Sequence, residues 1–180
     1  MVVLEQLSEL QKNLEIIEEN NKIIRSGSNI YILNKAKRDY ENFKALYEKK
    51  IIHKETLKEE DIDKLQVELY YKKETFHSVK RVMKEKIQRA NEEIEKAQAE
   101  VARLKKEIPE KYLIIFFGIL ETQTSPISTI KNSRCSACKH KIEDNEIYNI
   151  NNNDEIVFCP SCGRILSHSH KKDDKKCIAK

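Results

Sequence analysis

The chain has 180 residues, of which 36% are charged and 7% are aromatic, and its formal net charge is +4. It contains only three glycines and three prolines. A chain so charged and so poor in turn residues does not fold around one large globular core, and its composition is typical of long helices with solvated faces. The small net charge also excludes a protein that coats nucleic acid with its whole surface.

The first residues predict a coiled-coil helix. Apolar positions recur in steps of three and four, with one polar position, in a seam formed by Val3, Leu7, Leu10, Leu14, Ile17, Asn21 and Ile24. Met1–Leu10 holds acidic residues and no long apolar stretch, which does not fit a signal peptide. The longest apolar run, Leu113–Leu120, is far shorter than the ~20 residues of a membrane-spanning helix. We therefore expect a cytoplasmic protein with no membrane segment.

A second seam is the most regular one in the chain. It is formed by Met83, Ile87, Ala90, Ile94, Ala97, Val101, Leu104 and Ile108. Neither glycine nor proline occurs from Ser28 to Ile108, so nothing there forces the backbone out of a helix. Because a helix that buries one stripe needs a partner, we predict a long antiparallel coiled-coil hairpin over residues 1–117, with a possible break at 26–28.

The turn of this hairpin has two candidate positions. A turn at Tyr70–Thr75 is preferred because it makes two helices of similar length, Asn29 to about Tyr70 and about Lys72 to Ile108. Lys58–Asp63 is the more polar alternative. A parallel dimer of long helices would bury the same seams, so both a monomer and a homodimer fit the pattern.

Pro109 is expected to interrupt the last helix or to begin a new one. The dense apolar run Leu113–Leu120 is then expected to pack against the small domain that follows, with a membrane-surface or oligomer contact as the alternatives. Thr122–Thr129 is rich in Ser and Thr and predicts a linker or an irregular strand.

Two C-x-x-C pairs predict a metal site made of Cys135, Cys138, Cys159 and Cys162. Two cysteines around a tight turn point both sulfurs at one ion, and two such turns complete a tetrahedral shell of four thiolates. Gly163 suits the left-handed turn after the second pair. We predict one structural Zn²⁺ ion, although an iron site would use the same ligands. A redox dithiol would need one pair at a helix start in an α/β setting, and a catalytic zinc would need an open position.

The segment between the pairs predicts a β-hairpin. Glu146–Ile150 and Glu155–Phe158 read as short strands, joined by a turn at Asn151–Asp154. We expect a small β zinc ribbon over residues 118–170 and a basic flexible tail over 171–180. The predicted fold class is therefore mostly α, a long antiparallel coiled-coil hairpin followed by a zinc ribbon.

Basic residues surround the cysteines and are candidates for nucleic-acid binding: Lys131, Arg134, Lys139, Lys141 and Arg164. Tyr148 and Phe158 are candidates for base stacking, although Phe158 is also expected in the core. A solvated basic face explains the lysines equally well, because acidic residues lie among them. A four-cysteine site leaves His140, His168 and His170 as surface residues, and Cys177 as a free exposed thiol.

Two segments carry a family resemblance: Cys135-Ser-Ala-Cys138 followed by Lys-His, and Cys159-Pro-Ser-Cys-Gly-Arg-Ile-Leu166. With them the chain resembles the bacterial four-cysteine zinc-ribbon proteins that have an N-terminal coiled-coil hairpin. The resemblance implies a role in flagellar biogenesis, with a sigma factor of the RpoN type or flagellar export components as protein partners and nucleic acid as a proposed ligand of the ribbon. Ser167 departs from the family, which usually has an aromatic residue there, and the arms look shorter.

We expect an adaptor or transcription regulator rather than an enzyme, because the sequence has no Gly-rich phosphate loop, no nucleophile elbow and no open metal site. Its coiled coil would bind a protein, and its ribbon RNA, DNA or a second protein. The alternative is an RNA polymerase secondary-channel factor, whose coiled-coil tip is acidic. Glu59-Glu60-Asp61-Ile62-Asp63 would supply that tip only if the hairpin turns there.

Overall fold

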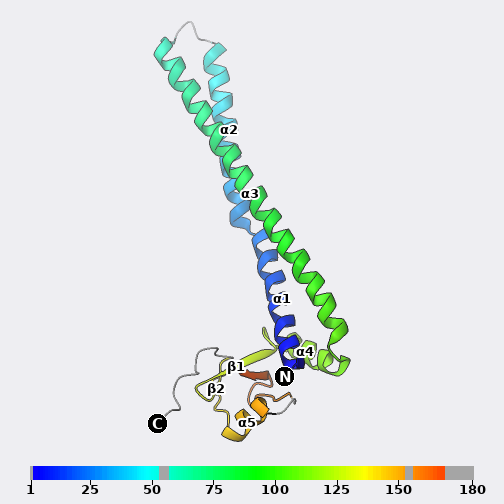
Figure 1. The fold of residues 1–180 in the computed structure, drawn as a ribbon. Helices are drawn as coiled ribbons and strands as arrows, with labels where there is room; N and C mark the ends of the chain where they lie inside the picture. Colours follow the sequence, from blue (N-terminus) through cyan, green and yellow to red (C-terminus); the bar gives the residue numbers. More distant parts are fainter. Residues whose placement is uncertain (1, 53–56, 153–155, 169–180) are drawn as a thin grey trace, which may run out of the picture. The chain divides into compact units, whose positions relative to one another are not determined.

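A computed structural model describes residues 2–52, 57–152 and 156–168. The chain divides into two compact units: Ile17–Glu95, and Met1–Ile16 together with Lys96–Lys180. As predicted, it is mostly helical with one small sheet (Figure 1). The predicted tail, residues 171–180, and with it Cys177, lies outside the described residues.

Three helices form the coiled-coil part: α1 (Val2–Ile24), α2 (Gly27–Ile52) and α3 (Glu59–Glu107). In the unit Ile17–Glu95, the Asn20 side chain donates to Glu93 at 2.9 Å, and the rings of Tyr40 and Phe76 stack with centroids 6.0 Å apart. From the first pair to the second, the residue number increases on the α1–α2 arm and decreases on α3, so the two arms pack antiparallel (Figure 1). The predicted hairpin is thus confirmed. The polar residue buried in its seam is Asn20 rather than the expected Asn21.

The preferred turn at Tyr70–Thr75 is wrong, because α3 runs through it without interruption. The chain reverses between Ile52 and Glu59, next to the more polar alternative. The error came from leaving the first helix out of the hairpin. Helices α1 and α2 have 23 and 26 residues, which together equal the 49 of α3. The break expected at residues 26–28 is where α1 gives way to α2.

The second unit has an apolar core where helix ends meet the sheet. Helix α3 ends at Glu107, and α4 (Glu110–Thr122) begins directly after Pro109. Phe116 of α4 is completely buried in a cluster with Leu7, Leu10, Leu104, Ile108, Ile127 and Ile165. Burying one such side chain contributes about 1.5–3 kcal/mol. The expectation that Leu113–Leu120 packs against the following domain is confirmed.

The sheet has three short strands: β1 (Ile127–Lys131), β2 (Arg134–Cys135) and β3 (Ile165–His168), in the order β2-β1-β3. Asn132 and Ser133 join β1 to β2 with φ values of 52° and 54°, as a tight hairpin turn of the right twist requires. Strand β3 pairs with β1 in parallel, Ile127 opposite Ile165. A parallel neighbour needs a long crossover, and this crossover contains both cysteine pairs.

The hairpin predicted between the cysteine pairs is wrong, because Glu146–Ile150 lies in helix α5 (Asp144–Asn152). The Glu146 side chain accepts a hydrogen bond from the backbone N–H of Glu143 at 3.2 Å, which is half of a capping box. Ile142, just before the cap, and Ile147, in the first turn, belong to one apolar cluster and fix the helix entry. These local contacts outweigh the β propensity of the isoleucines.

Phe158 forms an isolated β-bridge with Ile165 and is 40% exposed. The expectation that it belongs to the core is therefore wrong. Of the predicted turn Asn151–Asp154, the first two residues belong to α5 and the other two lie outside the described residues. Among the described residues, no helix is both long enough and apolar enough to cross a membrane.

The Gln11 side chain links α1 to the start of the sheet. Its Oε1 accepts from the Ile127 backbone N–H at 2.8 Å, and its Nε2 donates to Ser125 Oγ at 2.7 Å. We predict that Gln11→Ala lowers the free energy of unfolding by about 1–2 kcal/mol, because it leaves the N–H of a buried residue unpaired. Urea unfolding measures this change. The exposed neighbour provides a control, Lys12→Ala, and equal stability of the two variants would contradict the prediction.

Candidate metal centre

The structure brings together the four cysteines that the sequence predicts as metal ligands. Their sulfur atoms all lie within 4.8 Å of one another. The Sγ atoms of Cys135 and Cys162 are 3.8 Å apart, and those of Cys138 and Cys159 are 3.6 Å apart. Four sulfurs about 2.3 Å from a tetrahedral centre are separated by about 3.8 Å. The donor set therefore has the size and chemistry of a four-thiolate zinc site.

The two cysteine pairs lie on two turns of the same geometry. In the first, the Cys135 N–H donates to the His140 carbonyl at 2.9 Å, and the Lys139 N–H donates to the Cys135 carbonyl at 2.8 Å. In the second, the Cys159 N–H donates to the Arg164 carbonyl at 2.8 Å, and the Gly163 N–H donates to the Cys159 carbonyl at 2.9 Å.

Each turn ends on a left-handed residue, Lys139 with φ 66° and Gly163 with φ 70°. The predicted role of Gly163 is confirmed. Lys139 takes the same backbone conformation at a cost of about 1–2 kcal/mol, because its Cβ crowds the following carbonyl.

Separate elements position the two turns. Strand β2 ends on Cys135, and β3 begins soon after Cys162. The turns rest on an apolar cluster that includes Ile130, Ile142, Ile150 and Leu166. Cys135 and Cys159 are buried, while Cys138 and Cys162 are partly exposed.

The sulfur of Cys135 is prepared to carry a negative charge. Burial by itself raises the pKa of this thiol. The backbone N–H groups of Cys138 and Ala137 and the hydroxyl of Ser128 donate to the sulfur, and together they bring its pKa down to about 6. Hydrogen bonds to the charged form stabilise a thiolate in this way.

In the second pair, the pKa of Cys159 shifts in the opposite direction to that of Cys135. Burial raises the pKa of Cys159 to about 12, and the neighbouring thiols of Cys138 and Cys162 add to the rise. At Cys162 burial again acts upward, but the N–H and guanidinium groups of Arg164 bring its pKa below the usual value. Four sulfurs this close cannot all ionise on their own. A divalent cation among them removes the conflict and displaces the remaining protons.

Ser128 is a polar residue of the site that sequence reasoning missed. It is 4% exposed on β1, and its Oγ lies 3.2 Å from the sulfur of Cys135. The same oxygen accepts from the Ala137 N–H at 3.1 Å and lies 2.9 Å from the Ser136 hydroxyl. One hydroxyl thus both orients a ligand and braces the turn that carries it. No short sequence pattern marks it, because its partners Cys135, Ser136 and Ala137 lie seven to nine residues further along the chain.

The five candidate nucleic-acid residues separate into two groups. Lys131 is paired with Arg134 across β1 and β2, and Arg134 is bridged to Lys141. Residues directly opposite in antiparallel pairs share a face, so three exposed cations lie side by side. Arg134 also donates from Nη1 to the Lys139 carbonyl at 3.1 Å. The other two candidates lie outside this row and donate to backbone carbonyls as well. Lys139 Nζ donates to the Ser136 carbonyl at 2.7 Å, and Arg164 Nε donates to the Ser125 carbonyl at 2.8 Å.

The remaining polar and aromatic candidates are also placed. His140 is exposed and contributes its backbone carbonyl to the first turn. Tyr148 is 65% exposed on α5. His168 is the last residue of β3, and His170 lies outside the described residues.

The family of C4-type zinc ribbon domains matches residues 134–166, which include all four cysteines and well under half of the chain. No curated protein sequence is significantly similar to this one. Together with the sulfur geometry, the family match identifies a zinc ribbon that binds one structural zinc ion.

Solved structures with weak similarity come from three bacteria. The CT398 protein of Chlamydia trachomatis is 20% identical, with 93% of this chain and 80% of that chain covered and a TM-score of 0.40. A protein of Mycobacterium smegmatis is 16% identical, with 92% of this chain and 86% of that chain covered and a TM-score of 0.42. The HP0958 protein of Helicobacter pylori is 22% identical, with 93% of this chain and 89% of that chain covered and a TM-score of 0.33. Scores this low do not establish a common fold.

We predict that Ser128→Ala weakens zinc affinity about 10-fold to 100-fold, because it removes the hydroxyl that orients Cys135. Competition with a chromophoric chelator measures the affinity. Ser161→Ala is the matched control, an exposed serine in the second turn. Affinities that are the same for Ser128→Ala and the control would show that the hydroxyl does not support the metal.

Proposed function

We propose that the protein is a non-enzymatic, cytoplasmic adaptor whose zinc ion shapes the ribbon and whose coiled coil binds a partner protein. The observation that carries this proposal is the four-sulfur site. Four thiolates complete the tetrahedral shell of zinc, and a catalytic zinc would need a position for water or substrate. The metal then has a structural role, and function depends on surfaces.

The hairpin offers such a surface. Helix α2 has no buried residue along its whole length. Large apolar side chains on it are exposed, among them Ile30 (55%) and Tyr31 (60%), which line one hollow of this helix. Apolar residues grouped at a surface are typical of protein interaction sites. By the resemblance described above, the partner would be a flagellar export component or a sigma factor of the RpoN type.

The ribbon offers a second surface at Lys131, Arg134 and Lys141. Like charges placed opposite each other on neighbouring strands destabilise a sheet, so the two lysines do not help the fold, whereas Arg134 donates a hydrogen bond to the Lys139 carbonyl at 3.1 Å. The group of three cations suits a ligand with closely spaced negative charges. A nucleic-acid backbone has that chemistry, and its binding weakens as salt displaces the phosphate contacts.

We predict that a Lys131→Gln/Lys141→Gln variant binds single-stranded RNA more weakly than the wild type at low salt. Each lost phosphate contact lowers the slope of log affinity against log salt by about 0.7, so the slope should fall by about 1.4. Fluorescence anisotropy over a salt series measures it. A matched control is Lys80→Gln/Lys84→Gln, which changes two exposed lysines of α3. If both variants lose the same RNA affinity, or neither loses any, the two ribbon lysines do not form an RNA-binding site.

One observation favours a second candidate function, that of an RNA polymerase secondary-channel factor. Because the hairpin turns between Ile52 and Glu59, the acidic residues Glu59, Glu60 and Asp61 form the first turn of α3, beside the reversal of the chain. Acidic residues at this position also stabilise a helix through its dipole, and Asp61 lies 3.8 Å from Lys64. The helix therefore accounts for these charges without any partner.

We predict that the protein does not stimulate transcript cleavage by purified RNA polymerase. A Glu59→Gln/Glu60→Gln/Asp61→Asn variant should behave as the wild type in this assay, and so should a control, Glu92→Gln/Glu95→Gln, changed elsewhere on α3. Cleavage that is stimulated by the wild type and by the control, but not by the triple variant, would replace the adaptor proposal with this one.

A further inference from the structure

The segment Ser125–Ile127, which leads into the sheet, is held by two distant parts of the chain. From α1, the Gln11 side chain donates to Ser125 Oγ at 2.7 Å and accepts from the Ile127 N–H at 2.8 Å. From the second cysteine turn, Arg164 Nε donates to the Ser125 carbonyl at 2.8 Å. All of these residues belong to the same compact unit. Ser125 therefore has a helix of the coiled coil on one of its polar groups and the metal centre on the other.

The Gln11 amide has a fixed orientation. Its Nε2 donates to Glu15 Oε1 at 2.9 Å as well as to Ser125, and its oxygen accepts from Ile127. The Ser125 hydroxyl donates in turn to the Ile127 carbonyl at 2.9 Å. Among the described residues, these hydrogen-bond partners of Gln11 include no cysteine. Any effect of Gln11 on the metal must pass through the segment that it holds.

Arg164 joins that segment to the metal ligands. Its backbone carbonyl accepts from the Cys159 N–H at 2.8 Å and so closes the second turn. Its guanidinium hydrogen-bonds the sulfur of Cys162, while Nε reaches Ser125. A planar guanidinium has donors that point in several directions, whereas the donors of a lysine all lie on one atom. Arginine is therefore suited to contact a sulfur and a carbonyl at the same time.

Metal ligation and the contact at Ser125 depend on the same turn. A zinc ion fixes the sulfurs of Cys159 and Cys162 against those of the first pair, and with them the position of Arg164. Removal of the metal releases the turn, and the guanidinium then no longer has one fixed place on Ser125. Because coupling between two sites is reciprocal, a contact that zinc stabilises must also strengthen zinc binding.

We propose that Gln11, Ser125 and Arg164 form a hydrogen-bond network that couples zinc binding in the ribbon to the packing of the first turns of α1. The N-terminal part of the coiled coil, residues 2–16, would then respond to the metal state of the ribbon. In this network Arg164 and Gln11 are positioning residues. The network needs the zinc site but not the adaptor function, so its failure would leave the adaptor proposal untouched.

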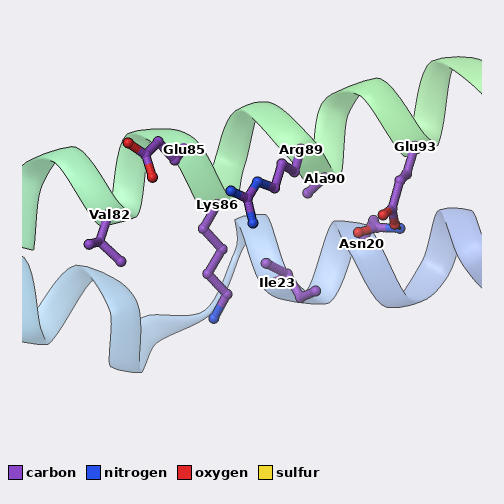
Figure 2. Close-up of a pocket in the computed structure, with 8 residues that line it drawn as sticks. All are labelled: Asn20, Ile23, Val82, Glu85, Lys86, Arg89, Ala90 and Glu93. Atoms are coloured by element: carbon purple, nitrogen blue, oxygen red, sulfur yellow. The ribbon is translucent and has the colours of Figure 1, made fainter.

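Zinc affinity of the full reduced chain, measured by competition with a chromophoric chelator, is the first test. Gln11→Ala should weaken zinc binding about 3-fold to 10-fold, the range that the loss of one hydrogen bond spans. The control is Asn20→Ala on the same helix. It removes a hydrogen bond to Glu93 at 2.9 Å, which Figure 2 shows between α1 and α3, and Asn20 belongs to the other unit. Equal affinities of the two variants would overturn the proposal.

A double-mutant cycle separates the network from independent structural effects. Arg164→Lys keeps the charge but not the two contacts, and it should weaken zinc binding about 10-fold. Gln11→Ala/Arg164→Lys should bind zinc no more weakly than Arg164→Lys alone, because Gln11 acts on the metal only through Arg164. Residues of one network are non-additive in this way, whereas independent losses multiply. Losses that multiply in the double variant would overturn the proposal.

Hydrogen exchange followed by mass spectrometry tests the coupling from the other end. In the wild type, removal of zinc by a chelator should speed exchange in residues 2–16 at least ~5-fold, because the first turns of α1 then open more often. Peptides from residues 30–50, in the other unit, are the internal control and should not change.

The variant Arg164→Lys shows whether this response uses the network. With zinc bound, its residues 2–16 should already exchange faster than those of the wild type, and removal of zinc should add little. If zinc speeds or slows exchange equally in the variant and the wild type, the coupling passes through the apolar cluster instead. That result, or exchange in the wild type that does not depend on zinc, would overturn the proposal.

Discussion

The ribbon depends on four sulfur atoms that are held closer together than uncompensated charges allow. The structure places pairs of them 3.6 and 3.8 Å apart, two of the cysteines buried and two partly so. Among the described residues, the surrounding cluster contains four isoleucines, one leucine and one valine besides the cysteines. A core this small does not stabilise such a domain without a staple. The zinc ion supplies it, because one cation neutralises thiolate charge and ties two distant turns together.

The hairpin has a different source of stability and a different weakness. Its arms hold each other through side-chain contacts along an antiparallel register, and few of its residues are fully buried. Helices of this kind depend on tertiary packing more than on propensity. Helix α2, which follows the interruption after Ile24, has no buried residue, and large apolar side chains come to the surface there. The thin packing of this arm therefore links the stability of the hairpin to its proposed binding role.

How much the sequence predicted depends on how local each signal is. The four cysteines and Gly163 were predicted because metal ligation requires fixed residue types at short spacing. The hairpin followed from periodicity, but its turn did not, because two seams can pair in several registers. Helix α5 was missed although Glu143, Glu146 and the flanking isoleucines mark it. The parallel pairing of β1 with β3 joins residues far apart in the sequence, and the hydroxyl of Ser128 acts across a hairpin on residues seven to nine positions away. No short residue pattern encodes either contact.

The central claim is that a single tetrahedral zinc ion, bound by four thiolates, holds the ribbon. Elemental analysis of the purified, reduced protein, combined with the visible spectrum after replacement of zinc by cobalt, tests it most directly. The account predicts one metal ion per chain and the intense ligand-field bands of a tetrahedral four-thiolate site. A reduced chain that holds no metal in stoichiometric amount, or a cobalt spectrum without tetrahedral bands, would contradict it.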